Sequence, residues 1–481
     1  MSRILIVETK NKTGESVELF GWVHGRRDHG KIIFIDLRDR SGVVQVVFTP
    51  QDKEQYKIAE TLRSEWVLKI TGKVAKRPET MVNEEIETGK IEIQPESLEV
   101  LNSATTPPFA LDTDGREIGE EHRMKYRYLD LRRERMAKNM ALRHRVAKFI
   151  RDFLDKEGFL EIETPIMTKS TPEGARDYVV PSRLYPGKFY ALPQSPQQYK
   201  QLLMVAGIEK YFQIARCFRD EDTRGDRQPE FTQMDLEMSF VEREDIMAIN
   251  EELLIKIVET LMPDKKIQEK PFPRLSYKEA MEKYGMDRPD LREHPDDPNL
   301  LAFCWVIDFP FFEKTDAGEW IPNEAEARSV PSRPRTGWTF THNPFSAPKP
   351  EHMEWLMEKK NIGEILTTQY DVILNGFEIG GGSIRNHQAE ALKKVFEILG
   401  LEEEIITRNF GHMLEAFGYG APPHGGIAWG LDRLVALLAD EPNIREVIAF
   451  PKTGDARDLM MNSPSELEEK QLKELHLQIK K

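Results

Sequence analysis

The chain has 481 residues, with 68 Lys and Arg against 82 Asp and Glu, a formal net charge of −14. A single core rarely serves this length, so we expect two or three domains, and the acidic balance argues against a general nucleic-acid coat while allowing a local basic patch. The cysteines, Cys217 and Cys304, lack metal-ligand spacing. With no signal-like or membrane-length apolar run, the chain is expected to be cytoplasmic, without disulfides or zinc.

The first hundred residues predict a small barrel. Apolar runs typical of strands occupy 17–23, 31–39, 43–48, 66–74 and 90–101, and a helical pattern occupies 51–62. Five strands with a helix between the third and fourth indicate an OB-fold barrel over 1–102. Residues 103–130 break this periodicity and predict a linker or hinge.

The rest of the chain, 131–481, predicts a second fold in which strands and helices alternate after a charged helix near 130–157. The predicted class is therefore α+β and multidomain, an OB-fold barrel followed by a larger domain.

The second predicted strand suits contact with nucleic acid. Its inner face would hold Ile33, Ile35 and Leu37, and its outer face Phe34, Asp36 and Arg38. An outward aromatic ring can stack on a base, which is worth roughly 1–3 kcal/mol, and Arg26, Arg27 and Lys31 cluster in the preceding predicted loop. A solvated basic turn is an equally good explanation, because OB folds also bind sugars and proteins.

A second informative segment, 211–240, predicts two apolar strands joined by a charged loop. One face of the second strand carries an aromatic ring, an amide and two carboxylates, which belong to Phe231, Gln233, Asp235 and Glu237. So many polar groups on one strand favour a binding surface over a salt-bridged hairpin. Arg219 ends the first strand, where its donor fork can neutralise a phosphate.

A third segment, 370–385, predicts a hairpin that turns at Asn375-Gly376. If Ile373 pairs with Glu378, then Asp371 lies diagonal to Glu378 at about 7–8 Å between backbones. Both carboxylates could then reach Mg²⁺ bound to a triphosphate. The following glycines, 380–382, would let a ligand approach the backbone closely.

A fourth segment, 424–438, is rich in glycine and carries an arginine. Gly425, Gly426 and Gly430 are expected to open a helix whose first turn holds Arg433. A helix N-terminus together with an arginine can anchor a triphosphate. Combined with the acid pair of the third segment, this pattern predicts an ATP site.

Together these segments resemble the three signature motifs of class II aminoacyl-tRNA synthetases over nearly the whole chain. The segments at 21–48, 170–178, 189–203, 218–235, 370–385 and 426–438 are most similar to bacterial aspartyl-tRNA synthetases. No H-I-G-H or K-M-S-K-S stretch is present, so the class I alternative fails.

The resemblance implies that residues 131–481 form a catalytic domain with an antiparallel sheet flanked by helices, and it implies a role for each matching residue. It places residues 156–167 in a homodimer interface and makes Arg219 and Arg433 the catalytic arginines. Aspartate would be held by Glu173, Ser195, Gln197, Lys200, Arg219, Gln233, Asp235, His342 and Arg385. ATP would be held by Arg219, Asp220, Glu221, Gln228, Phe231, Glu378, Gly430, Leu431, Asp432 and Arg433, with Mg²⁺ on Asp371 and Glu378. The anticodon would meet Arg27, Asp28, His29, Phe34, Gln45 and Glu92.

Substrate choice also has a charge argument. An aspartate side chain needs cationic partners, which the resemblance assigns to Lys200 and Arg385. A site for asparagine would not favour two cations against a neutral amide. The implied reaction activates aspartate with ATP and transfers it to tRNA without a side-chain general base.

The chain departs from the bacterial pattern in two places. By the resemblance, a short segment near 286–304 replaces an inserted domain of about a hundred residues, a typical domain size. The usual His-His-Pro-Phe stands here as His342-Asn343-Pro344-Phe345. The missing insert leaves open which tRNA contacts it would have made, and Asn343 leaves open the role of the family's second histidine.

His29 bears on which tRNA is charged. Enzymes of this family strict for tRNA(Asp) tend to have leucine at this position, and those that also charge tRNA(Asn) tend to have histidine. We therefore expect an enzyme that charges both tRNAs. The alternative stays open that His29 is a loop residue without influence on tRNA choice and that the enzyme is strictly specific for tRNA(Asp). Two further alternatives are a paralogue that makes free asparagine through an aspartyl-adenylate and a non-enzymatic nucleic-acid-binding protein.

Overall fold

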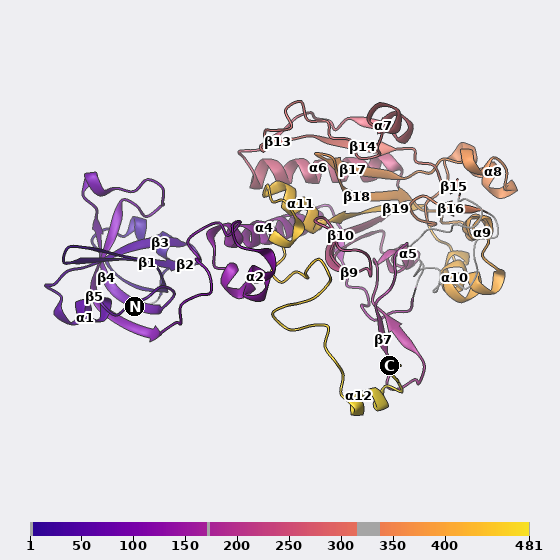
Figure 1. Cartoon of the computed structure of the whole chain (residues 1–481). Coiled ribbons are helices and arrows are strands. Elements are labelled where there is room, and N and C mark those ends of the chain that lie inside the picture. Colours follow the sequence, from indigo (N-terminus) through magenta and orange to yellow (C-terminus); the bar gives the residue numbers. More distant parts are fainter. Residues whose placement is uncertain (1–2, 171–173, 315–336, 481) are drawn as a thin grey trace. The chain divides into compact units, whose positions relative to one another are not determined.

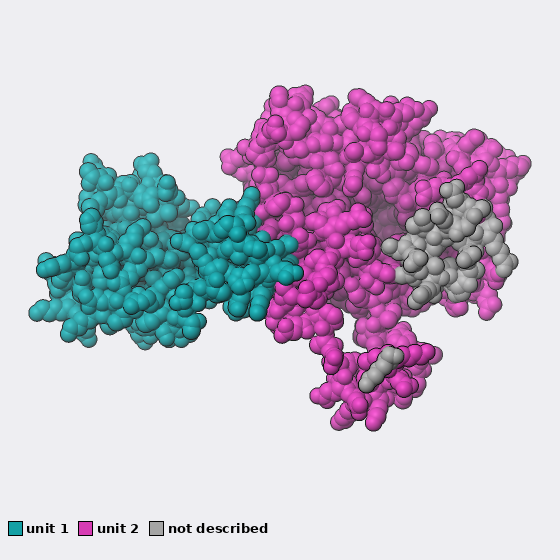
Figure 2. Space-filling model, viewed as in Figure 1, with its two compact units in different colours: residues 1–138 teal, residues 139–481 magenta. Residues whose placement is uncertain are grey.

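A computed structural model describes residues 3–170, 174–314 and 337–480 (Figure 1). The chain divides into two compact units, residues 1–138 and 139–481, which Figure 2 distinguishes by colour. The boundary thus falls eight residues beyond residue 130, where the expected linker ends. In the described parts of the chain, no helix has the length and apolar character needed to cross a membrane.

Unit 1 contains a closed five-stranded barrel in the order β1-β2-β3-β5-β4, as the sequence predicts. Its strands are β1 (Ser16–His29), β2 (Ile32–Asp39), β3 (Gly42–Phe48), β4 (Val67–Lys76) and β5 (Ile91–Asn102), and α1 (Lys53–Ala59) lies between β3 and β4 in the chain. Strand β1 is longer than expected and includes Arg26 and Arg27, so their placement in a loop was wrong. Lys31 alone of these three cations lies in the turn.

The barrel core confirms the alternation on β2. Ile33, Ile35 and Leu37 are buried with the other inward side chains. Arg38, expected on the outer face, is also buried, because Glu65 accepts a hydrogen bond from its Nη2 at 2.8 Å. This pairing offsets the cost of removing two charges from water.

The last part of unit 1 is organised around one buried carboxylate. After α2 (Glu120–Lys125), the short helix α3 (Arg127–Asp130) ends at Asp130, which is fully buried. Asp130 accepts hydrogen bonds from Arg127 at 2.8 Å, Arg133 at 2.8 Å and Arg123 at 3.2 Å. Each arginine is itself buried, so the four charges depend on one another.

Unit 2 is built on an eight-stranded, mostly antiparallel sheet in the order β12-β14-β17-β18-β19-β10-β9-β6. These strands are β6 (Leu160–Glu161), β9 (Lys210–Phe218), β10 (Glu230–Ser239), β12 (Arg274–Ser276), β14 (Phe303–Ile307), β17 (Tyr370–Leu374), β18 (Phe377–Ile384) and β19 (His424–Gly430). Short pairs are formed by β7 (Val179–Pro181) with β8 (Phe189–Ala191), β11 (Lys266–Ile267) with β13 (Leu300–Leu301), and β15 (Phe312–Lys314) with β16 (Trp338–Phe340).

Helices pack on this sheet and bury one of its faces (Figure 1). The helices of unit 2 are α4 (Glu134–Lys156, beginning in unit 1), α5 (Gln197–Val205), α6 (Arg243–Leu261), α7 (Tyr277–Tyr284), α8 (Met353–Glu358), α9 (Ala389–Ile398), α10 (Glu403–Gly418), α11 (Leu431–Leu438) and α12 (Glu469–Glu474). Apolar side chains of α4, α6 and α11 pack with Met234, Leu236 and Met238 of β10 in one core. Alternation then turns the polar residues of β10 to the opposite face.

We expect Asp130→Ala to lower the free energy of unfolding by about 3–5 kcal/mol, because three buried arginines lose their shared partner. Urea unfolding of the full chain measures this change. Asp114→Ala is the matched control, since its ion pair with Arg116 is 56% exposed on each side and should contribute little. Equal losses in the two variants would contradict the role assigned to Asp130.

Candidate active site

The polar face of β10 forms the floor of the candidate site. Register pairs Glu237 with Gly426 of β19 and with Tyr211 of β9. A Cβ atom on Gly426 would lie 2.0 Å from Glu237 Oε2, so glycine is required for this carboxylate to cross over β19. Gly425 and Gly426 therefore lie in a strand, and the expectation that they open a helix was wrong; only Gly430 caps α11.

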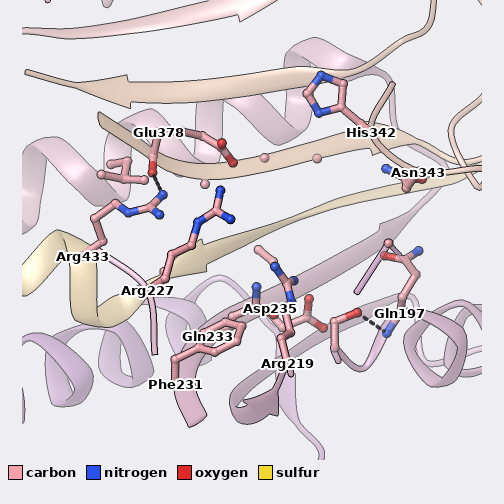
Figure 3. A pocket seen from close by; sticks show the side chains of 18 of the residues that line it. Gln197, Arg219, Arg227, Phe231, Gln233, Asp235, His342, Asn343, Glu378 and Arg433 are labelled. Atoms are coloured by element: carbon pink, nitrogen blue, oxygen red, sulfur yellow. Dashed lines mark hydrogen bonds between the residues drawn. The ribbon is translucent and has the colours of Figure 1, made fainter. Parts of the chain in front are cut away.

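A cavity of about 580 Å³ opens above this floor (Figure 3). It brings together most of the residues expected to bind aspartate: Ser195, Gln197, Lys200, Arg219, Gln233, Asp235, His342 and Arg385. It is also lined by most of those expected to bind ATP: Arg219, Glu221, Gln228, Phe231, Glu378, Gly430, Asp432 and Arg433. Glu173 lies outside the described residues.

Two residues expected to bind ATP do not line the cavity. The Asp220 backbone pairs with Arg176, and its carboxylate lies 3.5 Å from the Arg176 guanidinium. Leu431 is 1% exposed and packs into the core, so its side chain is directed away from any ligand.

The two cations expected to attract an aspartate side chain already have carboxylate partners. Arg385 donates to both oxygens of Glu237, from Nε at 2.8 Å and from Nη2 at 3.0 Å. Lys200 Nζ lies 2.7 Å from Asp235 and 3.2 Å from Glu237. All four side chains are buried, and the residues form a charge-balanced cluster. These carboxylate partners of Lys200 and Arg385 were not foreseen from the sequence.

The two carboxylates of this cluster differ in protonation energetics. Burial alone would raise the pKa of Glu237, but Arg385 and Lys200 outweigh it and lower that pKa to about 2. Burial raises the pKa of Asp235, and Lys200 opposes this only in part. Asp235 Oδ2 is buried without a hydrogen-bond partner among the described residues. Asp235 is thus the carboxylate that lacks a second cation.

Arg219 and Phe231 form a stacked pair at the cavity wall. The Arg219 guanidinium lies 5.0 Å from the centroid of the Phe231 ring, and its Nε lies 3.4 Å from the Gln194 carbonyl oxygen. A cation over the face of an aromatic ring is attracted to the ring electrons, and this attraction orients both groups. Arg219 can neutralise a phosphate here while the ring offers a surface for a planar base.

Arg433, in the first turn of α11, reaches across to the hairpin. It donates to the Glu378 carbonyl oxygen and, from Nη2 at 3.1 Å, to Asp226 (Figure 3). Its Nε is buried with no partner among the described residues. The neighbouring Asp432, although at the cavity wall, binds Arg143 and the Thr232 backbone N–H and so ties α11 to β10.

The expected acid pair is brought together differently from the prediction. Ile373 pairs with Glu378 as expected, but a bulge shifts Asp371 opposite Gly381 instead of Gly380. Asp371 is 3% exposed, does not line the cavity, and accepts a hydrogen bond from Gln369 at 2.8 Å. A Cβ atom on Gly381 would lie 2.5 Å from its Oδ1.

The same two carboxylates are suited to hold a cation. Burial raises the pKa of Asp371 well above its usual value, and the charge of Glu378 raises it further. A divalent ion bound by Glu378 at the cavity, with Asp371 behind Gly381, would relieve this repulsion. The described residues contain no group of three or more His, Cys, Asp or Glu arranged for a metal. Further ligands would therefore have to come from a bound triphosphate or water.

His342 and Asn343 lie on the opposite side of the cavity from Asp235 (Figure 3). The His342 ring makes an edge contact with Phe309 at 4.6 Å between centroids. Burial lowers the pKa of His342, against the opposing charge of Glu378, so a neutral ring is expected near pH 7. Asn343 accepts a hydrogen bond from the Phe345 backbone N–H and so shapes its own loop.

The barrel residues expected to meet an anticodon divide between two faces. Register places Arg27 opposite Phe34, and Gln45 opposite Asp36, on one face. Gln45 Nε2 lies 3.4 Å from Glu92, which joins the same group. By alternation along β1, His29 also faces this side and Asp28 the other; Asp28 instead forms a two-point ion pair with Arg26.

The sequence-based site omitted Glu237, Arg227 and Gln369. Glu237 had a visible signal, its position on the polar face of β10, but no family role had been attached to it. Arg227 and Gln369 line the cavity from a loop and from a position before β17, where no periodicity marks them.

Comparison with known families identifies the class of protein. The family described as tRNA synthetases class II (D, K and N) matches residues 119–454, and the OB-fold nucleic acid binding domain matches residues 17–101. The chain belongs to the class II tRNA synthetases of this D, K and N group. Its α+β architecture of an OB barrel and a sheet flanked by helices, predicted from the sequence, is thereby confirmed.

Named relatives narrow the resemblance further. The chain is 43% identical to the aspartate–tRNA(Asp/Asn) ligase of Rubrobacter xylanophilus, covering 98% of this chain and 95% of the relative. It is 42% identical to the aspartate–tRNA ligase of Macrococcus caseolyticus, covering 98% and 97%. Among solved structures, asparaginyl-tRNA synthetase from Pyrococcus horikoshii has a TM-score of 0.73 at 24% identity, covering 94% of this chain and 98% of that one, which shows a shared fold.

We expect Glu237→Gln to lower the free energy of unfolding by about 3 kcal/mol near pH 7, because Arg385 and Lys200 lose a shared buried partner. A folded pKa near 2, below the ordinary 4.5, means that the stabilising charge is complete above pH 4.5 and is lost as the pH falls toward 2. The difference from wild type should therefore narrow below pH 4.5. Urea unfolding at pH 7 and pH 3.5 measures it.

Glu230→Gln is the matched control, because Glu230 lies on the same strand but its side chain is 36% exposed. A difference between Glu237→Gln and wild type that stays constant over this pH range would contradict the assigned charge state.

Proposed function

We propose that this chain is an aspartate–tRNA ligase that activates L-aspartate with ATP and transfers it to the 3′ end of tRNA. The observation that carries the proposal is Asp235, a buried carboxylate at the cavity wall whose second oxygen has no hydrogen-bond partner among the described residues. An α-ammonium group would supply the second cation that Asp235 lacks. The chain matches relatives named as aspartate–tRNA ligases over nearly their whole length, which supports the same conclusion.

The charge cluster supports aspartate over asparagine as substrate. When the α-ammonium binds Asp235, it takes over part of the role of Lys200, whose ammonium is then available to a second carboxylate. The side-chain carboxylate of aspartate, between Lys200 and Arg385, would restore charge balance. With the α-carboxylate of the amino acid paired with Arg219, an asparagine amide would leave the buried cluster with one uncompensated positive charge, that of the α-ammonium, which is costly.

In the first step, an oxygen of the aspartate α-carboxylate attacks the α-phosphorus of ATP, and the bond to the bridging oxygen of pyrophosphate breaks. Arg219 would neutralise the charge that develops on the α-phosphate, while Phe231 stacks on adenine. Arg433 would hold the γ-phosphate through its unpartnered Nε. Glu378 would hold Mg²⁺ at the cavity, with the charge of the buried Asp371 behind Gly381 in support, and the bound ion would neutralise phosphate charge.

In the second step, the ribose 3′-hydroxyl of the terminal tRNA nucleotide attacks the carbonyl carbon of aspartyl-adenylate, and AMP leaves. The released phosphate can accept the hydroxyl proton, so no side-chain base is required. Positioning and charge stabilisation then carry the catalysis.

Assembly and location follow as parts of the same proposal. We expect a homodimer, because three apolar side chains of 156–167 are exposed: Leu160 by 53%, Ile166 by 48% and Met167 by 60%. We also expect a cytoplasmic location, as predicted from the sequence. The alignment with the Rubrobacter relative spans 592 positions against 481 residues here, so that relative carries segments that this chain lacks. This supports the loss of the inserted domain near 286–304.

The range of tRNA acceptors is the finer part of the proposal. The anticodons of tRNA(Asp) and tRNA(Asn) differ at one base, and His29 lies on the barrel face that carries Arg27 and Phe34. Some relatives are named aspartate–tRNA ligase and others aspartate–tRNA(Asp/Asn) ligase. We favour the charging of both tRNAs.

Aspartate should support ATP–pyrophosphate exchange by the full chain, and asparagine should not. Phe231→Ala should raise the KM for ATP about tenfold, since stacking on a base is worth roughly 1–3 kcal/mol. Phe240→Ala, an exposed ring at the far end of β10, is the control and should leave KM unchanged. Absence of aspartate-dependent exchange would refute the enzyme and favour a binding protein.

Purified tRNA(Asp) and tRNA(Asn) should both be aspartylated, and His29→Leu should reduce charging of tRNA(Asn) about fivefold while sparing tRNA(Asp), as expected for one lost hydrogen bond. Lys31→Leu, in the adjoining turn, is the control and should weaken both tRNAs alike. No charging of tRNA(Asn) by the wild type would establish strict specificity. Ammonia-dependent release of asparagine without tRNA charging would favour the asparagine-forming paralogue.

A further inference from the structure

A buried chain of hydrogen bonds runs from β19 through α5 to the edge of the cavity. His424 Nδ1 lies 2.7 Å from the carbonyl oxygen of Pro422, and His424 Nε2 lies 3.1 Å from the amide nitrogen of Gln201. The Gln201 amide oxygen then lies 3.0 Å from the amide nitrogen of Gln197. His424 and Gln201 are fully buried, and Gln197 lines the cavity.

The direction of this chain is set at its Pro422 end. A carbonyl oxygen can only accept, so His424 Nδ1 must carry the proton and donate. A neutral imidazole has a single N–H, so Nε2 is an acceptor and the Gln201 amide must donate to it. The amide oxygen of Gln201 is therefore directed toward Gln197, which has to donate in turn.

The surroundings of His424 keep its ring neutral. Burial lowers the pKa of His424 and outweighs the opposing charge of Glu237, while Arg385 and His387 lower it further. Two further rings lie near His424, Phe417 at 6.2 Å and His387 at 6.4 Å between centroids.

We infer that Gln201 and His424 are positioning residues that hold the Gln197 amide with its oxygen toward the cavity, as an acceptor for the α-ammonium group of the amino acid. Gln197 lies on the same side of the cavity as Asp235 (Figure 3). A reversed amide would present an NH₂ group to the ammonium, which is a donor facing a donor. The inference rests on the proposed function for the identity of this ligand.

Gln201→Met keeps the size of the side chain but removes both hydrogen bonds, so the Gln197 amide can turn freely. We expect the KM for aspartate in pyrophosphate exchange to rise about tenfold, because a hydrogen bond to a charged group is weakened. The KM for ATP should stay unchanged. Gln198→Met is the matched control: Gln198 is the same residue type on the same helix, 6% exposed, and does not line this cavity.

A double-variant cycle separates positioning from general packing. If Gln201 acts through Gln197, the double variant Gln197→Ala with Gln201→Met will have the same aspartate KM as Gln197→Ala alone. Additive effects of the two changes, or an unchanged aspartate KM in Gln201→Met, would overturn the inference.

A second measurement needs no activity. NMR of ¹⁵N-histidine-labelled wild type, with His424 assigned by comparison with His424→Gln, should show a protonated Nδ1 and an unprotonated Nε2 near pH 7. A protonated Nε2 would overturn the direction of the chain. Failure of wild-type exchange with aspartate would remove the proposed function while leaving this readout intact.

Discussion

The buried cluster of Lys200, Asp235, Glu237 and Arg385 is the constraint on which the rest of the site depends. Two cations and two carboxylates, each expensive to bury alone, occupy one face of the central sheet. Burying these four charges together places conditions on the neighbouring elements. Gly426 on β19 leaves space for Glu237, and helix α5 places Lys200 against β10. The unpartnered oxygen of Asp235 follows from this balance, because Glu237 takes contacts from both cations and Asp235 from Lys200 alone.

The opposite face of the same sheet supplies the rigidity that such a cluster needs. Apolar residues of β10 alternate with the charged ones and pack beneath α4, α6 and α11. A charge pair stabilises only if its geometry is held, because attraction falls as the groups separate while the cost of burial remains. The apolar core therefore contributes to recognition, although of its buried residues only a few, such as Ile379 and Ile444, line the cavity.

The fold and much of the site were predictable because both follow from periodicity. Alternation on β2 and β10 predicted which side chains face inward, and the Asn375-Gly376 turn predicted the β17–β18 hairpin. The bulge beside Val372 was not predictable, since nothing in the residue types marks an extra residue on one strand. The partners of Lys200 and Arg385 were missed for another reason: pairing depends on which strands become neighbours, and sequence pattern does not report this.

Gly426 also limits how the enzyme could be re-engineered. Widening or narrowing a binding site usually means exchanging side chains along its floor, but any side chain at 426 would displace Glu237 and, with it, Arg385. Position 426 on β19 therefore cannot take a larger residue, because Glu237 of the neighbouring strand β10 occupies the space. Libraries aimed at other amino acids would do better to vary the roof, around His342 and Asn343, where side chains meet loops instead of a packed sheet.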